Sequence, residues 1–373
     1  MPSWSDIDNE TAYQFQGRTR AFTFGLRDRE KTHDAALDAR GSRDISKVLV
    51  LELGTLRMSE LTIDEIHEAA SRIKGYIRRT PLISCAPVHD SAEIGDSLML
   101  KLECIQVTGS FKARGAINKL KSLSPDDLSR GIITASGGNH GLAVAYAGWL
   151  ARVPTRIYLP TTAPADKIEK LRKWGADVVI EGAAWDDSNR IAVSVAEREG
   201  LAYFHPFADP VVIAGQGTIA LEILYDAPQS ETLLVAIGGG GLISGIAVAA
   251  KAINPRIRIV GVEPIGAATL YSSLKAGRVV ELEKIETAAG TLGARMTSQL
   301  NLDLVREYVA EIVLVSDDEM RAGARWLWFE LGIAAELSGA AAVAAVLSGR
   351  YRAANGERIC ALICGAGSDG LQT

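Results

Sequence analysis

From residue 131 onward, the chain alternates short apolar runs with amphipathic stretches of helical length. The predicted strands cover residues 132–135, 156–160, 176–181, 202–205, 233–237 and 258–263. The predicted helices cover residues 141–151, 165–174, 188–199, 217–225 and 242–253. Repeated strand–helix–strand units with short connections predict an α/β fold, in which parallel sheets are flanked by helices on both faces.

The first part of the chain differs from this pattern. Residues 1–57 mix charges of both signs without a clear period, which predicts a weakly ordered extension or an artefact of an upstream start. The segment from Met58 instead carries apolar residues at three- and four-residue steps, namely Ile63, Ile66, Ala70, Ile73 and Ile77. This spacing predicts a helix that starts at Thr62 and stops before Pro81.

Composition limits the possible partners and compartments. A chain of 373 residues is long enough for two α/β lobes, and a net charge of -5 does not suggest a nucleic acid or an anionic membrane as partner. No apolar run reaches the length that spans a bilayer, and the acidic start does not resemble a signal or transit peptide. The four cysteines form neither a disulfide framework nor a zinc set, so we expect a cytoplasmic protein.

Four consecutive glycines, Gly238, Gly239, Gly240 and Gly241, precede Leu242. Such a run could be a flexible linker or a structural turn. Here an apolar strand precedes it and an amphipathic helix follows it directly, which a linker does not require. Backbone N–H groups without side chains at the start of a helix form a nest for an anion, so we predict a phosphate site.

A lysine in the run Ser110-Phe111-Lys112-Ala113-Arg114 is the first candidate for covalent chemistry. Lysine amines form Schiff bases when a desolvated site makes them nucleophilic. Phe111 is compatible with a packed wall beside such a site. The alternative is an ordinary solvated lysine in the first turn of a helix.

The third motif lies between a predicted strand and a predicted helix and reads Ser136-Gly137-Gly138-Asn139-His140-Gly141. Open α/β sheets bind ligands at this position, outside the carboxyl ends of the strands. The hydroxyl and N–H groups of the loop could hold a substrate carboxylate. Alternatively, Asn139 could cap the helix and His140 could be a surface histidine with satisfied hydrogen bonds.

Together these motifs resemble the fold-type II pyridoxal-phosphate enzymes, which share a two-lobed fold similar to tryptophan synthase β. The branch is that of threonine/serine dehydratases and serine racemases. Seven motifs occur in the order of that branch between residues 61 and 371, namely TPL, SFKARGA, SGGNHG, HPFADP, AGQGT, GGGGL and CGAG. The resemblance implies a large cofactor domain (residues 58–130 and 208–373), a small inserted domain (131–207), and a dimeric or tetrameric homo-oligomer.

The resemblance also assigns roles to residues. It implies that Lys112 forms an imine with pyridoxal 5'-phosphate, and that Phe111 packs against the cofactor ring. Asn139 would contact the phenolic oxygen of the ring, and Cys364 would face the pyridine nitrogen. The remaining roles are phosphate binding by Gly238, Gly239, Gly240, Gly241 and Leu242, and substrate binding by Ser136, Gly137, Asn139 and His140.

Several positions depart from the branch. Gly137 stands where the racemases have a serine that works on the second face of the substrate, so elimination is favoured over racemisation. Glu263 matches a metal-site acid of some relatives, but Thr269 follows where another acid is needed, so no metal is expected. Gly290 replaces the aspartate of a family motif. Glu336 could lie near the cofactor ring or be solvated.

These residues predict β-elimination of water and ammonia from a small β-hydroxy amino acid, which yields a 2-oxo acid. A thiol at Cys364 does not enforce protonation of the ring nitrogen, and this suits elimination. The substrate remains open among threonine, serine, 3-hydroxyaspartate, phenylserine and products of hydroxyectoine breakdown. The alternatives are an amino-acid racemase, a β-replacement synthase, and a non-catalytic protein that binds a metabolite.

Overall fold

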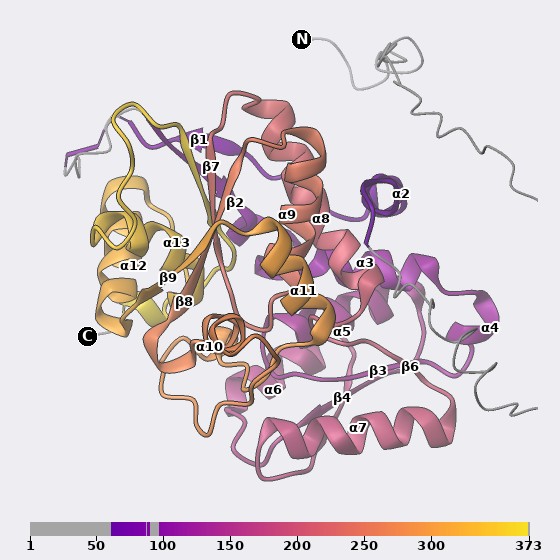
Figure 1. Ribbon diagram of the computed structural model, residues 1–373. Helices are drawn as coiled ribbons and strands as arrows, with labels where there is room; N and C mark the ends of the chain where they lie inside the picture. Colours follow the sequence, from indigo (N-terminus) through magenta and orange to yellow (C-terminus); the bar gives the residue numbers. More distant parts are fainter. Residues whose placement is uncertain (1–60, 87, 90–96, 372–373) are drawn as a thin grey trace, which may run out of the picture. The chain divides into compact units, whose positions relative to one another are not determined.

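The computed structural model describes residues 61–86, 88–89 and 97–371 (Figure 1). The prediction of a weakly ordered extension over residues 1–57 lies outside this range. Within it, the strands form two separate sheets flanked by helices, which confirms the predicted α/β fold. No helix in this part of the chain combines the length and the apolar character that crossing a membrane requires.

The larger sheet contains six strands. Their order is β1 (Leu82–Ser84), β2 (Leu98–Leu102), β10 (Ile359–Ile363), β7 (Thr232–Ala236), β8 (Arg258–Pro264) and β9 (Glu311–Val315). Among the described strands of this sheet, only the β1–β2 pair is antiparallel. β2 pairs with β10, in a register that sets Leu102 opposite Ile363. The early strand β2 and the late strand β10 therefore end side by side. Cys364 follows β10 directly, and Lys112 comes after the two short 3-10 turns that follow β2.

The smaller sheet contains four parallel strands. Their order is β5 (Asp177–Ile180), β4 (Thr155–Leu159), β3 (Ile132–Ala135) and β6 (Ala202–Tyr203). Ile132 packs with residues of α5, whereas Ile133 packs with residues of α7. Successive strand side chains point to opposite faces, so helices cover both faces of this sheet. All described strands of this sheet lie within residues 131–207, the predicted small domain. The division of the chain into a small and a large domain stays a prediction.

The helices connect and cover these sheets. They are α2 (Ile63–Ile73), α3 (Lys112–Ser122), α4 (Pro125–Leu128), α5 (Asn139–Ala151), α6 (Ala165–Lys173), α7 (Trp185–Glu199), α8 (Pro210–Asp226), α9 (Gly241–Ile253), α10 (Thr269–Ala276), α11 (Gln299–Tyr308), α12 (Asp317–Leu331) and α13 (Leu337–Leu347). Short 3-10 turns cover Glu103–Ile105, Val107–Gly109, Ile265–Ala267, Gly290–Leu292 and Asp369–Leu371. The helix α13 contacts β7, β8, β9 and β10 of the larger sheet.

Several helix boundaries differ from the sequence-based expectations. The first helix starts after Thr62 as predicted, with a capping box to Glu65, but it ends at Ile73. α5 begins at Asn139, two residues early, and therefore carries part of the glycine-rich motif. α8 begins at Pro210, seven residues early, because Asp209 caps its first turn.

Glycines inside α8 serve helix packing. A Cβ on Gly215 would lie 2.7 Å from the Cα of Gly115 in α3. The two helices can approach this closely only because both positions lack side chains. This close crossing positions the start of α3, where Lys112 lies.

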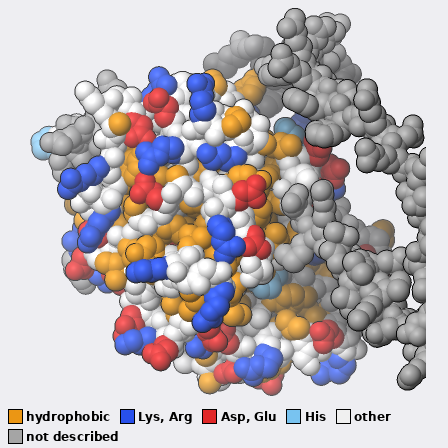
Figure 2. Space-filling model, viewed as in Figure 1, with side chains coloured by type: hydrophobic (Ala, Val, Ile, Leu, Met, Phe, Trp, Pro, Cys, Tyr) orange, Lys and Arg blue, Asp and Glu red, His pale blue; other side chains and the backbone are white. Residues whose placement is uncertain are grey.

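One face of the molecule mixes charges of both signs (Figure 2). On the face shown in Figure 2, lysine and arginine side chains are interspersed with aspartate and glutamate. That face does not carry the one-signed potential that is typical of nucleic-acid binding proteins.

Candidate active site

Lys112 is the first residue of α3, and its side chain is half-buried. Its Nζ donates a hydrogen bond to the carbonyl of Pro206 at 2.7 Å. Burial lowers the pKa of this amine to about 8, while the neighbouring Cys364 and Glu336 act in the opposite direction. The alternative of a solvated surface lysine is therefore wrong. A buried amine with a lowered pKa is suited to nucleophilic or general-base chemistry.

A buried ionic network fixes the beginning of α3. Arg114 is fully buried, and its guanidinium binds Glu103 at 2.7 Å and Glu222 at 2.8 Å. Lys101, also fully buried, pairs with Glu222 at 2.5 Å. The network joins the end of β2, α3 and α8, and thereby sets the direction in which Lys112 leaves the helix.

The four glycines form a cradle between β7 and α9. Gly240 has a φ of 98°, a left-handed conformation that favours glycine. A Cβ on Gly239 would enter the ring of Phe207, and a Cβ on Gly241 would lie 2.6 Å from the Phe207 carbonyl. Among the described residues, no acceptor pairs with the N–H groups of Gly238, Gly239 or Gly240. The loop therefore offers free donors at the start of a helix, as an anion site requires.

The segment that contains Pro206 and Phe207 brings Lys112 and the cradle together. Lys112 bonds to the carbonyl of Pro206, and the next residue, Phe207, lies against Gly239 and Gly241. Phe207 donates its N–H to Nδ1 of His205 at 3.2 Å, which holds the turn. The predicted lysine and the predicted phosphate loop thus adjoin the same short segment.

Asn139 lies at the start of α5 and donates from Nδ2 to Oε1 of Glu336 at 2.7 Å. The hydroxyl of Thr291 donates to the same oxygen at 3.3 Å. Glu336 is 9% exposed, and burial raises the pKa of its carboxyl. Of the two interpretations left open for Glu336, the solvated one is wrong. The carboxyl instead orients the Asn139 amide.

Cys364 follows β10 and lies beside the lysine segment. Its carbonyl accepts from the N–H of Phe111 at 3.2 Å, and its thiol donates to the carbonyl of Ser338 at 3.3 Å. Burial raises the pKa of the thiol, so Cys364 is a neutral group at physiological pH. A neutral thiol is the partner that the sequence predicted for the pyridine nitrogen.

The loop Ser136–Gly138 is half-buried at the end of β3. The hydroxyl of Ser136 accepts from the N–H of Gly138 at 3.3 Å. A Cβ on Gly137 would lie 3.1 Å from Cδ2 of Leu159, so a side chain there would require Leu159 to move. The loop is compact and leaves backbone groups accessible for a small ligand.

His140 differs from the other residues of its motif. It is 3% exposed, and its Nε2 lies 3.0 Å from the carbonyl of Phe204, so this nitrogen carries the hydrogen. Burial lowers the pKa of the imidazole to about 3, which keeps the ring neutral. The alternative of a surface histidine is wrong, whereas a substrate contact remains a prediction.

The carboxyl of Glu263 accepts hydrogen bonds at the start of α10. Its two carboxyl oxygens accept the N–H groups of Leu270 and Tyr271 at 2.8 and 2.9 Å, in the first turn of α10. Burial raises its pKa to about 8. In the described part of the chain, no three acidic, histidine or cysteine side chains are grouped as a metal site requires.

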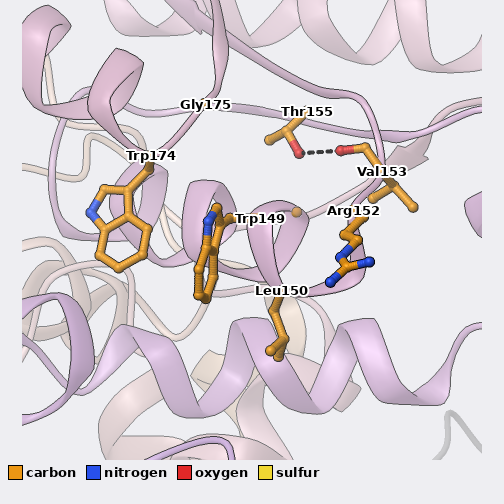
Figure 3. Close-up of a pocket in the computed structure, with 8 residues that line it drawn as sticks. Trp149, Leu150, Arg152, Val153, Thr155, Trp174 and Gly175 are labelled. Carbon is orange, nitrogen blue, oxygen red and sulfur yellow. Dashed lines mark hydrogen bonds between the residues drawn. The ribbon is translucent and has the colours of Figure 1, made fainter.

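A separate surface pocket lies at the other end of α5 (Figure 3). It encloses about 520 Å³ beside Trp149, Arg152 and Trp174. Because α5 spans 13 residues, this end is about 18 Å from Asn139. None of the residues that line the pocket belongs to the predicted site.

Some site residues carried no signal in the sequence. Thr297 and Asn301 both donate to the carbonyl of Gly239, but they lie in an ordinary amphipathic stretch. Pro206 belongs to the HPFADP motif, but it takes part through its carbonyl, as Ser338 does, and a group that every residue possesses predicts no contact. Glu336 was the exception, since the resemblance to the enzyme family drew attention to it.

Comparisons with known proteins agree with this geometry. Residues 73–365 match the family model described as pyridoxal-phosphate dependent enzyme. An L-threonine ammonia-lyase of Thermotoga maritima is 38% identical over 309 residues, which cover 83% of this chain and 76% of that protein. A serine racemase of Oryza sativa subsp. japonica is 39% identical over 290 residues, which cover 78% and 85%.

Solved structures are similar as well. Maize serine racemase superimposes with a TM-score of 0.78 and 37% identity, and the match covers 82% of this chain and 94% of that one. The processed form of threonine deaminase isoform 2 from Solanum lycopersicum gives a TM-score of 0.76 and 36% identity, with coverage of 82% and 90%. Both kinds of enzyme are therefore comparably similar to this chain.

Proposed function

The chain belongs to the pyridoxal-phosphate dependent enzyme family, and on that premise we propose that it eliminates water and then ammonia from a small β-hydroxy amino acid, threonine or serine in type. The observation that carries the proposal is the pairing of a buried lysine amine with a glycine cradle across one short segment. This is a pyridoxal-phosphate enzyme of the threonine dehydratase and serine racemase branch.

The residues present fit the cofactor. The cradle supplies unpaired N–H groups at the start of α9, which is what a phosphate monoester needs. Lys112 supplies an amine whose lowered pKa increases the fraction of its nucleophilic form. When bound, pyridoxal phosphate supplies an aldehyde for that amine and a ring that accepts electrons from the substrate.

The chain's own residues then have separable tasks. The amine of Lys112 would bind the cofactor aldehyde and, when not bound to it, would accept the proton from the substrate Cα as a general base. The Pro206 carbonyl holds the lysine Nζ in one place. The loop Ser136–Gly138 offers N–H groups to the substrate carboxylate, and Asn139, oriented by Glu336, offers an amide hydrogen to the ring hydroxyl.

Gly137 and Cys364 favour elimination. A racemase needs an acid on the second face of the substrate, and Gly137 offers no side chain there. Leu159 limits the room for one. The thiol of Cys364 is neutral and places no negative charge near the ring. Without a charged partner for the pyridine nitrogen, the bound cofactor would withdraw electrons less strongly, and this would favour loss of the β-hydroxyl over slower chemistry such as transamination.

Racemisation is the second candidate function. The serine racemase of Oryza sativa subsp. japonica is as similar in sequence as the L-threonine ammonia-lyase of Thermotoga maritima. Incubation with L-serine separates the two. We expect pyruvate and ammonia in the products, measured by a 2-oxo-acid assay. D-serine as the main product on a chiral column would contradict the proposal.

The assignment of Lys112 is tested by replacing it with alanine. We expect Lys112→Ala to lose the visible absorption band of the cofactor-loaded enzyme and to lower kcat by at least about a thousandfold. The control is Lys121→Ala, which changes a lysine on the same helix that lies over the ring of Tyr76. Wild-type turnover in Lys112→Ala would refute the assignment of Lys112. A colourless wild-type protein would favour a non-catalytic binding protein.

The substrate is identified by a screen for 2-oxo-acid release. The panel contains threonine, serine, 3-hydroxyaspartate, phenylserine and hydroxyectoine-derived amino acids. We expect β-hydroxy amino acids to react and matched amino acids without the hydroxyl, such as alanine, to be inert.

We also propose that the protein is a cytoplasmic homo-oligomer, either a dimer or a tetramer. Each subunit would have a large domain (residues 58–130 and 208–373) and a small domain (residues 131–207).

A further inference from the structure

The carbonyl of Gly239, inside the glycine cradle, is held by two side chains from a distant part of the chain. Thr297 donates to it from its hydroxyl at 3.0 Å, and Asn301 donates from Nδ2 at 2.9 Å. The same Nδ2 donates to the carbonyl of Phe207 at 2.9 Å. Thr297 is 3% exposed and Asn301 is fully buried, so these bonds are shielded from water.

Peptide geometry gives these bonds a consequence for the cradle. The carbonyl of Gly239 and the N–H of Gly240 belong to the same planar trans peptide, and they point in opposite directions. When Thr297 and Asn301 hold the oxygen toward α11, the N–H of Gly240 must point away from α11. A peptide between two glycines has little resistance of its own to rotation, so its orientation depends on such contacts.

The orientation of the Asn301 amide follows from its neighbours. Both atoms next to Nδ2 are carbonyl oxygens, which can only accept, so the nitrogen must face them. The other end of the amide, Oδ1, is buried and has no partner among the described residues. An unpaired buried acceptor is unfavourable. The chain tolerates this cost at a position where the two donated hydrogen bonds hold the cradle.

We propose that Asn301 and Thr297 are positioning residues for the phosphate of the cofactor, which they do not touch. They act through the carbonyl of Gly239, whose fixed direction keeps the N–H of Gly240 aimed into the anion site. Asn301 also ties the cradle to Phe207, next to the carbonyl that holds Lys112. The inference rests on the proposed function, because it requires that the cradle holds a phosphate.

The test compares pyridoxal phosphate with pyridoxal, which has the same aldehyde and ring but lacks the phosphate. Kd values for both are measured on cofactor-free protein by absorbance titration. Asn301→Leu keeps the branched shape and removes both donors, and Thr297→Val removes one hydroxyl at constant volume. The matched control is Gln299→Leu, an amide-to-leucine change at an exposed position of the same helix.

We expect Asn301→Leu to weaken pyridoxal phosphate binding by about 30-fold and Thr297→Val by about fivefold, since each lost hydrogen bond is worth about a factor of five and Asn301 makes two. Pyridoxal affinity should stay within about twofold of wild type in both variants, and Gln299→Leu should change neither. Equal losses for both ligands, or unchanged binding of pyridoxal phosphate, would overturn the inference.

Two further outcomes are distinguishable. If Asn301→Leu does not fold, as judged by circular dichroism, the ratio of the two Kd values in Thr297→Val decides the question by the same criterion. If the wild-type protein binds neither ligand, the proposed function fails. If the wild-type protein prefers pyridoxal phosphate over pyridoxal and the variants keep the same preference, only the positioning role is contradicted.

Discussion

At the scale of single residues, burial determines the chemistry of the site. Lys112 and Glu336 would both be charged in water, but burial shifts each toward its neutral form. A neutral lysine amine can attack an aldehyde or accept a proton. A carboxyl that accepts from Asn139 keeps that amide in one orientation. The protein obtains reactive groups by excluding water from ordinary side chains.

The lowered pKa of Lys112 predicts how the free amine depends on pH. Its pKa is about 8 in the folded protein, against an ordinary value of 10.5, so the neutral amine accumulates as pH rises through 8. The rate at which cofactor-free protein develops visible absorbance with pyridoxal phosphate should therefore rise between pH 7 and 9 and then level off. Stopped-flow absorbance measures this rate. An inflection near pH 10.5 would show a solvated amine.

At the scale of elements, the position of Lys112 depends on how α3 is held. Its close crossing with α8 requires Gly115 and Gly215, and Arg114 joins it to Glu103 and Glu222. The buried arginine lies only two residues after the lysine. Any displacement of the first turn of α3 would therefore move the reactive amine.

Removal of this arginine should destabilise the whole protein. Arg114→Met leaves the carboxylates of Glu103 and Glu222 without their cation, at an expected cost of about 3–5 kcal/mol in the free energy of unfolding. The control, Arg306→Met, removes an exposed ion pair with Asp303 and should cost less than about 1 kcal/mol. Urea unfolding measures the free energy of unfolding of both variants. Equal losses in the two variants would contradict the role of burial.

At the scale of the whole molecule, the site exists only where distant segments meet. The lysine segment follows β2, the Cys364 segment follows β10, and the cradle follows β7, which are neighbouring strands of the larger sheet. Asn139 comes from the start of α5, after the smaller sheet, and reaches Glu336. The parallel arrangement places the carboxyl ends of the strands at one edge, so their following loops share one region.

Buried histidines make the global stability depend on pH. The pKa of His140 is about 3 in the folded state and 6.5 when unfolded, so the unfolded state binds more protons between these values. The neutral imidazole of His140 therefore contributes to the free energy of unfolding above pH 6.5, and this contribution is lost as the pH falls. At pH 5 the loss is about 2 kcal/mol.

A variant isolates this contribution from the other titrating groups. His140→Gln retains a donor for the Phe204 carbonyl but does not titrate, so between pH 7 and 5 the cofactor-free wild type should lose about 2 kcal/mol more stability than the variant. Urea unfolding at both pH values provides the measurement. His67→Gln, at an exposed position of α2, is the control and should follow the wild type. Parallel behaviour of wild type and His140→Gln would contradict the prediction.

The sequence by itself determined the features that depend on neighbouring residues. Strand and helix periods, the capping box at Thr62, and a glycine loop between strand and helix are short-range properties, so the α/β fold and the cradle could be predicted. The lysine in the run SFKARGA was identified for the same reason, with the resemblance adding its role. Errors occurred at helix starts; α8, for example, begins seven residues before the predicted start, where Asp209 caps its first turn.

Only the tertiary structure decided which groups lie together and what state they are in. The contacts of Asn301 with Gly239, of Asn139 with Glu336 and of Lys112 with Pro206 join residues far apart in the chain. Such pairs arise from strand order and helix packing, which no local pattern encodes. The pKa values of buried groups depend on water exclusion and on these same neighbours, so they too become defined only when the chain is folded.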